Sequence, residues 1–346
     1  MSFDENPDYD NHPEKHYVRY LGWLPASKDY KRRNSNKPLK YFTLCAKQAL
    51  DIFTLEKEGV LQRDGNKNLP NVIVCEKYDT QAAEIFKVVR PPLQNAIIIG
   101  LLEELILYED NRDIISILEK LQTGERLIKR EREKLRIREK SNLLKNEFPF
   151  DIINIDACSS FLNTELTQNK MCQALKKIFE LQRPTQSFLL FITNPIRSDG
   201  IDSAAIRQLK TDFQSNRSHY KEIDTAIKMT FGNGAYYETI PEENRISFCF
   251  AKSVVMPAAI GWSHKHHGIF IYSSPDGTKM MSSIIEFTKI NQEKDETNYL
   301  NEIIRIIKEM PISYSKLDEP TKNRINQHFK SVKQYRDNIP TEFSQQ

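Results

Sequence analysis

Short apolar runs alternate along this chain with segments whose apolar positions recur every three or four residues. Four runs predict strands, because each is brief, rich in β-branched or aromatic residues and bounded by polar or turn-forming residues. These runs are residues 71–76, 96–100, 150–156 and 187–193. Helical spacing predicts helices between them, at 41–61 after a short extended lead-in, 80–89, 101–107 and 166–181. Such alternation favours an α/β fold with a Rossmann-like, mostly parallel sheet and helices on both faces.

The pattern changes in the last third of the chain. Residues 268–272 form an apolar run, 273–277 supply turn residues and 279–289 form a second run, so an antiparallel hairpin is expected to close the sheet. Helical spacing returns at 202–214, 220–229, 299–310 and 317–335, whereas the apolar stretch 246–260 fits no single type of element.

A long polar insertion, residues 110–146, separates the second and third predicted strands. It is expected to be helical, because Gly124 is its clearest helix breaker. Between residues 126 and 145 there are nine Lys or Arg against three Glu. These cations could line a phosphate backbone, or the interleaved Glu could mark a solvated or partner-binding strut. The residues expected to contact nucleic acid or a protein partner are Arg126, Lys129, Arg130, Arg132, Lys134, Arg136 and Arg138.

Composition narrows the class of protein. The chain has 346 residues, 39% hydrophobic and 28% charged, which suits a globular protein, and its net charge of +3 by itself implies no nucleic-acid partner. No apolar run approaches the ~20 residues of a membrane span, and the acidic start does not resemble a secretory signal. The five cysteines form no CxxC pair, so reduced thiols and a cytoplasmic location are expected, without structural zinc.

Three regions are predicted. Residues 1–40 are expected to be an N-terminal arm whose apolar cluster, Tyr17–Leu24, could dock on the body. Residues 41–290 would form the Rossmann-like domain that carries the insertion, and 291–346 a charged helical extension.

Parallel strand–helix units that end in an antiparallel hairpin resemble the class I S-adenosylmethionine-dependent methyltransferase superfamily over roughly residues 41–290. The resemblance implies that Glu76, which ends the strand at 71–76, holds the ribose hydroxyls of S-adenosylmethionine, because a carboxylate accepts two O–H bonds. It also implies that Asp156, at the end of the 150–156 strand, lies beside the methyl acceptor as the catalytic residue. The structural alternatives are a surface acid at Glu76 and a helix cap at Asp156.

The chain departs from that family at the cofactor loop. Tyr41–Lys47 contains no glycine, where the family has a glycine-rich loop that lets backbone N–H groups approach the cofactor. The small residues Thr43 and Cys45 are expected to substitute in part, and Glu103 is the expected partner of the adenine. The turn after Asp156, which begins Ala157-Cys158, lacks the Pro and Gly of the family's Asp-Pro-Phe-Gly variant.

A histidine cluster, His264, His266 and His267, is the remaining polar constellation. An exposed loop before the hairpin is the favoured interpretation, with a metal site or contact with a phosphate-bearing substrate as alternatives. No GxSxG motif marks a hydrolase nucleophile.

Two functional hypotheses follow from the sequence. The first is an S-adenosylmethionine-dependent methyltransferase-like protein that acts on, or docks to, nucleic acid. The second is a catalytically inactive Rossmann-fold module that serves as a binding or structural subunit of a larger intracellular assembly, such as a defence complex.

Overall fold

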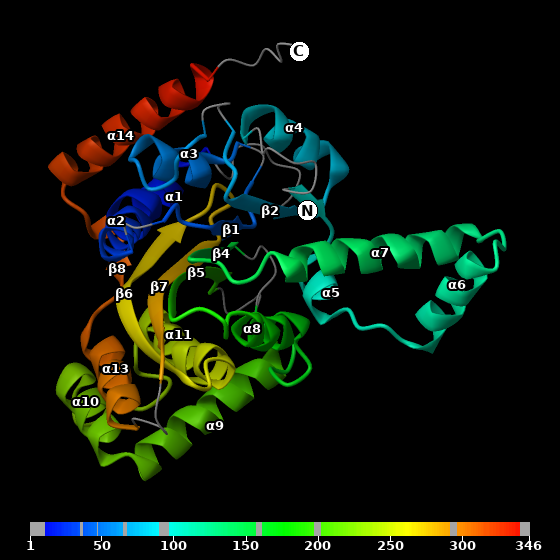
Figure 1. The fold of residues 1–346 in the computed structure, drawn as a ribbon. Helices are drawn as coiled ribbons and strands as arrows, with labels where there is room; N and C mark the ends of the chain where they lie inside the picture. The colour runs from blue at the N-terminus through cyan, green and yellow to red at the C-terminus, as the bar shows by residue number, and fades with distance from the viewer. Residues whose placement is uncertain are drawn as a thin grey trace.

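The computed structural model describes residues 11–34, 37–46, 48–64, 68–89, 97–156, 161–196, 202–290 and 296–339. Within them the chain forms an open, mostly parallel sheet of eight strands with helices on both faces (Figure 1). The predicted α/β fold class is therefore confirmed. Several positions used above lie outside the described residues, namely Lys47, Ala96 and the turn at 157–160 with Cys158.

Five strands, at 72–76, 97–99, 152–156, 187–195 and 279–289, coincide with the predicted runs. The strand at 41–43 was expected only as an extended lead-in to a helix, the strand at 262–273 begins earlier than expected, and the strand at 312–313 was not expected. All eight belong to one sheet. Their order across the sheet is β3-β2-β1-β4-β5-β7-β6-β8. Neighbouring strands pair in parallel except that β7 is antiparallel to both β5 and β6, so the predicted closing hairpin is present. The bounds are β1 (Tyr41–Thr43), β2 (Val72–Glu76), β3 (Ile97–Ile99), β4 (Ile152–Asp156), β5 (Ser187–Pro195), β6 (Trp262–Ser273), β7 (Lys279–Lys289) and β8 (Ile312–Ser313).

Two apolar cores lie on the two faces of the sheet. Successive strand residues point to opposite faces, so Ile152 belongs to one core and its neighbour Ile153 to the other, and both are fully buried. The first face, on which Ile153 lies, is covered by six helices of the described chain. They are α5 (Leu102–Leu107), α8 (Lys170–Leu181), α9 (Ser203–His219), α10 (Lys221–Phe231), α11 (Glu242–Phe250) and α13 (Glu296–Lys308). The stretch 246–260 is resolved as the end of α11, a π-helical segment η4 (Ala251–Val255) and a short α12 (Met256–Ala258).

The second face, on which Ile152 lies, is covered by helices from both ends of the chain. They are α1 (Pro13–Val18), the π-helical η1 (Arg19–Trp23), α2 (Leu24–Arg33), α3 (Leu50–Lys57), α4 (Asp79–Val89) and α14 (Glu319–Asp337), which follows the 3-10 turn η5 (Tyr314–Lys316). The blue and red ends of the chain thus pack together in Figure 1.

The N-terminal segment differs from the arm expected over residues 1–40. Its apolar cluster docks as expected, but 13–33 is one continuous helical segment that is part of the second core. Tyr17 and Trp23 are almost completely buried, and the Trp23 ring stacks on Phe191 of β5 at 5.3 Å. Burial of these large rings stabilises the segment against the sheet, so it is part of the folded body rather than an arm.

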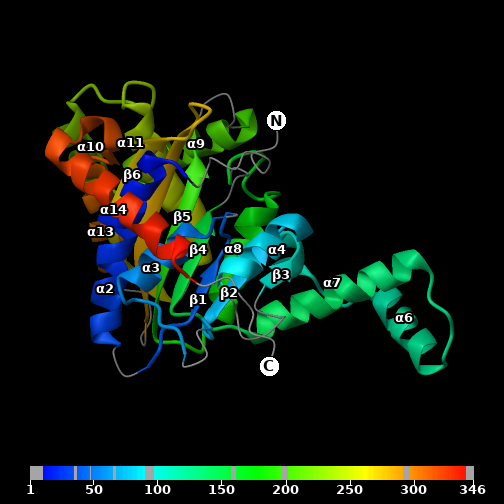
Figure 2. The same ribbon diagram turned by 90° about the horizontal axis from the view of Figure 1, so that it is seen from above.

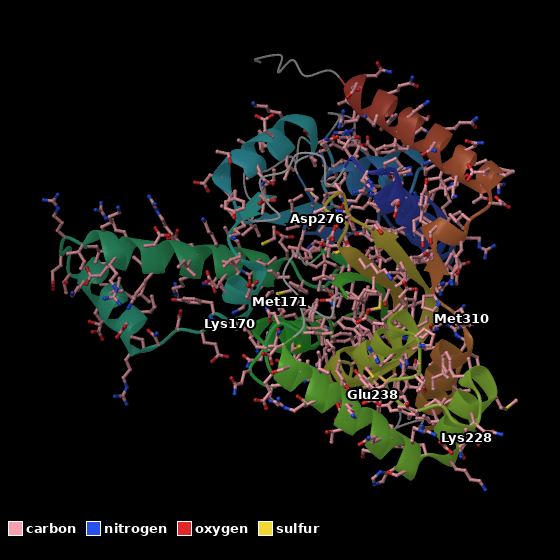
Figure 3. All side chains as sticks on the ribbon, turned by 180° about the vertical axis from the view of Figure 1, so that it is seen from behind. Lys170, Met171, Lys228, Glu238, Asp276 and Met310 are labelled. Atoms are coloured by element: carbon pink, nitrogen blue, oxygen red, sulfur yellow. The ribbon has the colours of Figure 1, made fainter. Side chains whose placement is uncertain are left out.

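The insertion is helical, as predicted, and its two helices form a hairpin that the sequence analysis did not specify. Helices α6 (Arg112–Gln122) and α7 (Lys129–Asn146) project from the body as two antiparallel rods (Figures 1 and 2). Only the base is anchored in the core, where Leu144 is buried and Ser141 donates a 2.6 Å hydrogen bond to the carbonyl of Leu105. Figure 3 shows side chains of the hairpin standing clear of the body on both sides.

Candidate functional site

The carboxyl edge of the sheet has a point where the chain changes direction. From β1 the chain proceeds to β2 and β3 on one side, then crosses to β4 and β5 on the other. In open parallel sheets, ligands bind outside the carboxyl ends of the strands at such a switch point. The candidate site is therefore the region around the carboxyl ends of β1 and β4, which we refer to as the crevice.

The floor of this crevice is a buried polar network around Asp51, in the first turn of α3. Its Oδ2 atom accepts hydrogen bonds from the hydroxyls of Tyr41 (2.8 Å) and Thr43 (2.7 Å). Asn154 of β4 donates to Thr43 Oγ1 at 3.1 Å and to the same Asp51 oxygen at 3.3 Å. These side chains are at most 3% exposed. The network ties β1, β4 and α3 together across the switch point.

A buried arginine adds a positive charge near this network. Arg19 of η1 is 1% exposed, and burial lowers its pKa while the charges of Asp51 and Asp156 oppose that shift. Burial raises the pKa of Tyr41, and the charge of Asp51 raises it further. The N-terminal helix thus supplies the positive charge that this crevice requires.

Asp156, the predicted catalytic residue, lies at the carboxyl end of β4 as expected. Its Oδ2 atom forms a 2.6 Å ion pair with Lys15 of α1, and the side chains are only 12% and 13% exposed. The lysine therefore compensates the charge of Asp156 inside the crevice. This partner was not foreseen from the sequence, although Lys15 and Arg19 lie four residues apart beside an apolar cluster, which places both on one helix face.

The two predicted cofactor acids lie on the same edge. Glu76 ends β2, where its Oε1 atom accepts the backbone N–H of Tyr78 at 3.0 Å, and Glu103 lies in the first turn of α5. Burial raises the pKa of Cys75, the residue before Glu76, and the charges of Glu76 and Glu103 raise it further. Glu76 thus lies at the carboxyl end of β2 and Glu103 shortly after the end of β3, and their role toward a cofactor stays a prediction.

Thr43 and Cys45 occupy the first strand and its exit but are buried rather than open to a ligand. The Thr43 hydroxyl is engaged with Asp51, and Cys45 is 4% exposed. Burial, and then the charges of Asp51 and Glu76, raise the pKa of Cys45 well above its ordinary value. Cys45 is therefore a buried side chain that is not open to a ligand.

The glycine-free loop after β1 nevertheless contains a left-handed residue. Ala49, immediately before α3, has φ 49° and ψ 33° and is completely buried. This conformation is one that glycine normally supplies, and alanine adopts it only when the surroundings impose it. The loop thus makes the required turn without glycine, and no sequence signal indicated it.

The expectation of an exposed histidine loop is wrong. His264, His266 and His267 are part of β6, and the first two are 8% and 4% exposed. Burial, and then the positive charge of Arg305, lower the pKa of His264 to about 4. His267 instead contacts Glu286 at 3.0 Å. Across the described residues no group of His, Cys, Asp and Glu is arranged to hold a metal ion.

The basic side chains of the hairpin are paired in the middle of α7 and unpaired at the tip. Lys134 and Arg138 pair with Asp113 and Asp110 at 2.7 and 2.8 Å, and Arg136 lies 3.8 Å from Glu133. Four predicted contact residues have no ion pair among the described residues: Arg126, Lys129, Arg130 and Arg132. All four are exposed and surround the first turn of α7, beside Ile128, which is 63% exposed.

Fold and crevice define an α/β protein with a Rossmann-like sheet and a polar, charge-compensated switch point. A family model described as PP_RS20740-like matches residues 136–248, about a third of the chain, from within α7 to within α11. A search of curated proteins finds no match. In the part of the chain that the structure describes, no helix is both long enough and apolar enough to cross a bilayer.

Proposed function

We propose that the protein is an S-adenosylmethionine-dependent methyltransferase-like protein that acts on, or docks to, nucleic acid. The observation that carries this proposal is the position of Glu76. It ends the strand next to β1, at the carboxyl edge beside the switch point, with Glu103 nearby. Two carboxylates at this place suit the hydroxyl and amino donors of an adenosine moiety.

The residues present fit the nucleoside half of the cofactor better than the methionine half. Glu76 would accept the ribose hydroxyls and Glu103 would face the adenine. Thr43 and Cys45 are buried, so the methionine half would depend on backbone groups of the loop after β1. The cofactor, when bound, supplies an electrophilic methyl group. Asp156, held by Lys15, would orient an acceptor by accepting its N–H or O–H.

The tip of the hairpin supports the nucleic-acid part of the proposal. Lys129, Arg130 and Arg132 lie in the first turn and a half of α7, where the helix dipole already presents partial positive charge. Cations at this end do not stabilise the helix, whereas the combined field attracts phosphate groups. Glu131 joins the two helices by pairing with Lys120 at 2.7 Å, which holds the tip in shape.

Calorimetric titration with S-adenosylmethionine tests the cofactor site. We expect saturable binding to the wild-type protein and a loss of about tenfold or more in Glu76→Ala, since hydrogen bonds to a charged group contribute roughly 1.5–3 kcal/mol. Glu84→Ala is the matched control, because Glu84 lies on α4, directly after β2, where its exposed side chain forms a 2.7 Å ion pair with Lys87. Equal affinities of wild type and Glu76→Ala would contradict the assigned role of Glu76.

Replacing the four tip cations Arg126, Lys129, Arg130 and Arg132 with glutamine tests the hairpin. We expect weaker binding to short RNA and DNA duplexes, and a slope of log K against log salt that is shallower by up to ~3.6, at ~0.9 per lost phosphate contact. The control removes four positive charges from the C-terminal region, by replacing Lys316, Lys322, Lys330 and Lys333 with glutamine. Equal salt dependence in the two variants would exclude the tip as the interface.

The second candidate is a catalytically inactive module that binds partners. The Lys15–Asp156 ion pair and the hydrogen bonds to Asp51 Oδ2 favour it, because these polar side chains already bind one another rather than a ligand. Absence of S-adenosylmethionine binding by the wild-type protein, together with partner binding through the hairpin, would establish this function instead.

A further inference from the structure

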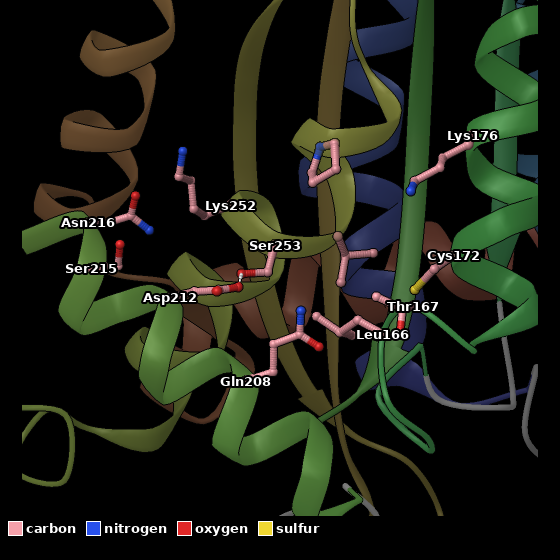
Figure 4. A pocket seen from close by; sticks show the side chains of 12 residues that line it. Leu166, Thr167, Cys172, Lys176, Gln208, Asp212, Ser215, Asn216, Lys252 and Ser253 are labelled. Atoms are coloured by element: carbon pink, nitrogen blue, oxygen red, sulfur yellow. Dashed lines mark hydrogen bonds between the residues drawn. The ribbon is translucent and has the colours of Figure 1, made fainter. Parts of the chain in front are cut away.

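A cavity lies in the helical layer on the face of the sheet that carries Ile153. It has a volume of about 320 Å³ and is enclosed by the α8 region, α9 and the π-helical segment η4 (Figure 4). None of its lining residues belongs to the crevice network or to the acids assigned to the cofactor. The volume falls at the lower end of the range that holds small ligands.

One wall of the cavity is an irregular helix. η4 continues α11 without a break, and its five residues make a π turn in which the Met256 N–H bonds to the Ala251 carbonyl. Pro257 has no N–H for the carbonyl four residues before it, so a regular ladder cannot continue. The turn presents Lys252 and Ser253 to the cavity. Such π turns occur often at functional sites.

The polar lining carries two positive charges and one negative charge. Lys252 from η4 and Lys176 from α8 lie at opposite sides of the cavity in Figure 4. The single carboxylate, Asp212, already accepts a 2.7 Å hydrogen bond from Ser253. Burial lowers the pKa of Lys252, so a bound anion would restore the stability of its charged form. The lining therefore selects for an anionic group.

The opposite wall offers hydrogen-bond acceptors. Gln208 of α9 lines the cavity, and its Oε1 atom is buried without a hydrogen-bond partner among the described residues. A buried acceptor of this kind normally has a donor. Oε1 is closed to solvent in this structure, so a ligand hydroxyl would supply that donor once the Gln208 amide turns toward the cavity, and Asn216, which is 9% exposed, adds an amide on the same wall.

We propose that this cavity is a binding site for a small phosphorylated polyol, with the phosphate between Lys176 and Lys252 and the hydroxyls toward Gln208 and Asp212. A phosphate monoester carries up to two negative charges at neutral pH, which matches two ammonium groups. Lysine is a common phosphate ligand that acts as a point charge. The site is independent of the crevice function.

Calorimetry with ribose 5-phosphate on the full-length protein tests the proposal. We expect saturable binding that weakens at least about tenfold in Lys252→Met, which keeps the apolar stem and removes the charge. Lys170→Met is the control, because Lys170 lies at the start of α8, exposed and outside the cavity (Figure 3).

Gln208→Leu supplies a second readout that does not change charge. Loss of affinity for ribose 5-phosphate with unchanged affinity for inorganic phosphate would support the assigned hydroxyl contacts. Absence of binding up to about 10 mM ribose 5-phosphate, or equal affinities in wild type and Lys252→Met, would overturn the proposal. Far-ultraviolet circular dichroism of each variant establishes that the helices are intact.

Discussion

Asp51→Ala is expected to lower the free energy of unfolding by ~3–5 kcal/mol, the range seen when one member of a buried charged cluster is removed. Three donors, from Tyr41, Thr43 and Asn154, lose their shared acceptor in a region that is at most 3% exposed. The buried guanidinium of Arg19 also loses a nearby negative charge. Urea unfolding followed by circular dichroism measures the change.

Asp337→Ala is the control for this prediction. Its ion pair with Arg336 is at the surface, where the carboxylate side chain is 60% exposed, and removal is expected to change stability by less than ~0.5 kcal/mol. A loss below ~1 kcal/mol in Asp51→Ala would show that water or repacking satisfies the stranded donors. The network would then not be what holds α3 against β1 and β4.

Gly22→Ala is expected to cost about 1–3 kcal/mol of stability, although alanine is the better helix former. A Cβ atom at this position would meet the Ile284 Cδ1 atom and lie 2.8 Å from the Phe270 ring. Helix η1 can therefore lie on β6 and β7 only because residue 22 has no side chain. A thermal unfolding series, checked against urea midpoints, measures the loss.

The clash itself can be tested by a double variant. Ile284→Val removes the Cδ1 methyl group, so Gly22→Ala should be less destabilising in that background, giving a coupling energy above ~0.5 kcal/mol. Gly234→Ala is the control, because a Cβ there meets no atom within 4 Å. Simple additivity of the two substitutions would mean that strain, rather than contact with Ile284, explains the effect of Gly22→Ala.

Both predictions depend on the N-terminal helical segment, residues 13–33, which the sequence analysis expected to be part of an arm. Asp51 lies near Arg19 of this segment, and Gly22 is part of it. Arg19 and Lys15 place positive charge against Asp51 and Asp156, and Gly22 allows the close approach that brings them there. The segment therefore contributes to the crevice as well as to the core. Truncations that remove residues 11–34 should not be used to assign activity to the remaining sheet.

The hairpin tip offers an extended surface that is separate from the crevice. The ion pairs of Lys134 and Arg138 reduce the seven predicted contact residues to a smaller group near the first turn of α7. Acids from the start of α6, and the loop before it, reach back to α7 and neutralise its middle. Pairing of this kind depends on how two helices lie side by side, so spacing along one helix does not indicate it.

The sequence by itself determined the alternation of strands and helices, the closing hairpin and the helical insertion. Short β-branched runs and three-to-four-residue periodicity are local properties, and the acids Glu76 and Asp156 could be placed because each ends such a run. Only the tertiary structure decided the burial of His264 and His266, the left-handed turn at Ala49, and the approach of Lys15 and Arg19 to the crevice. These features arise where segments far apart in the chain pack together, because burial and charge pairing between distant segments override the preferences that a local pattern can express.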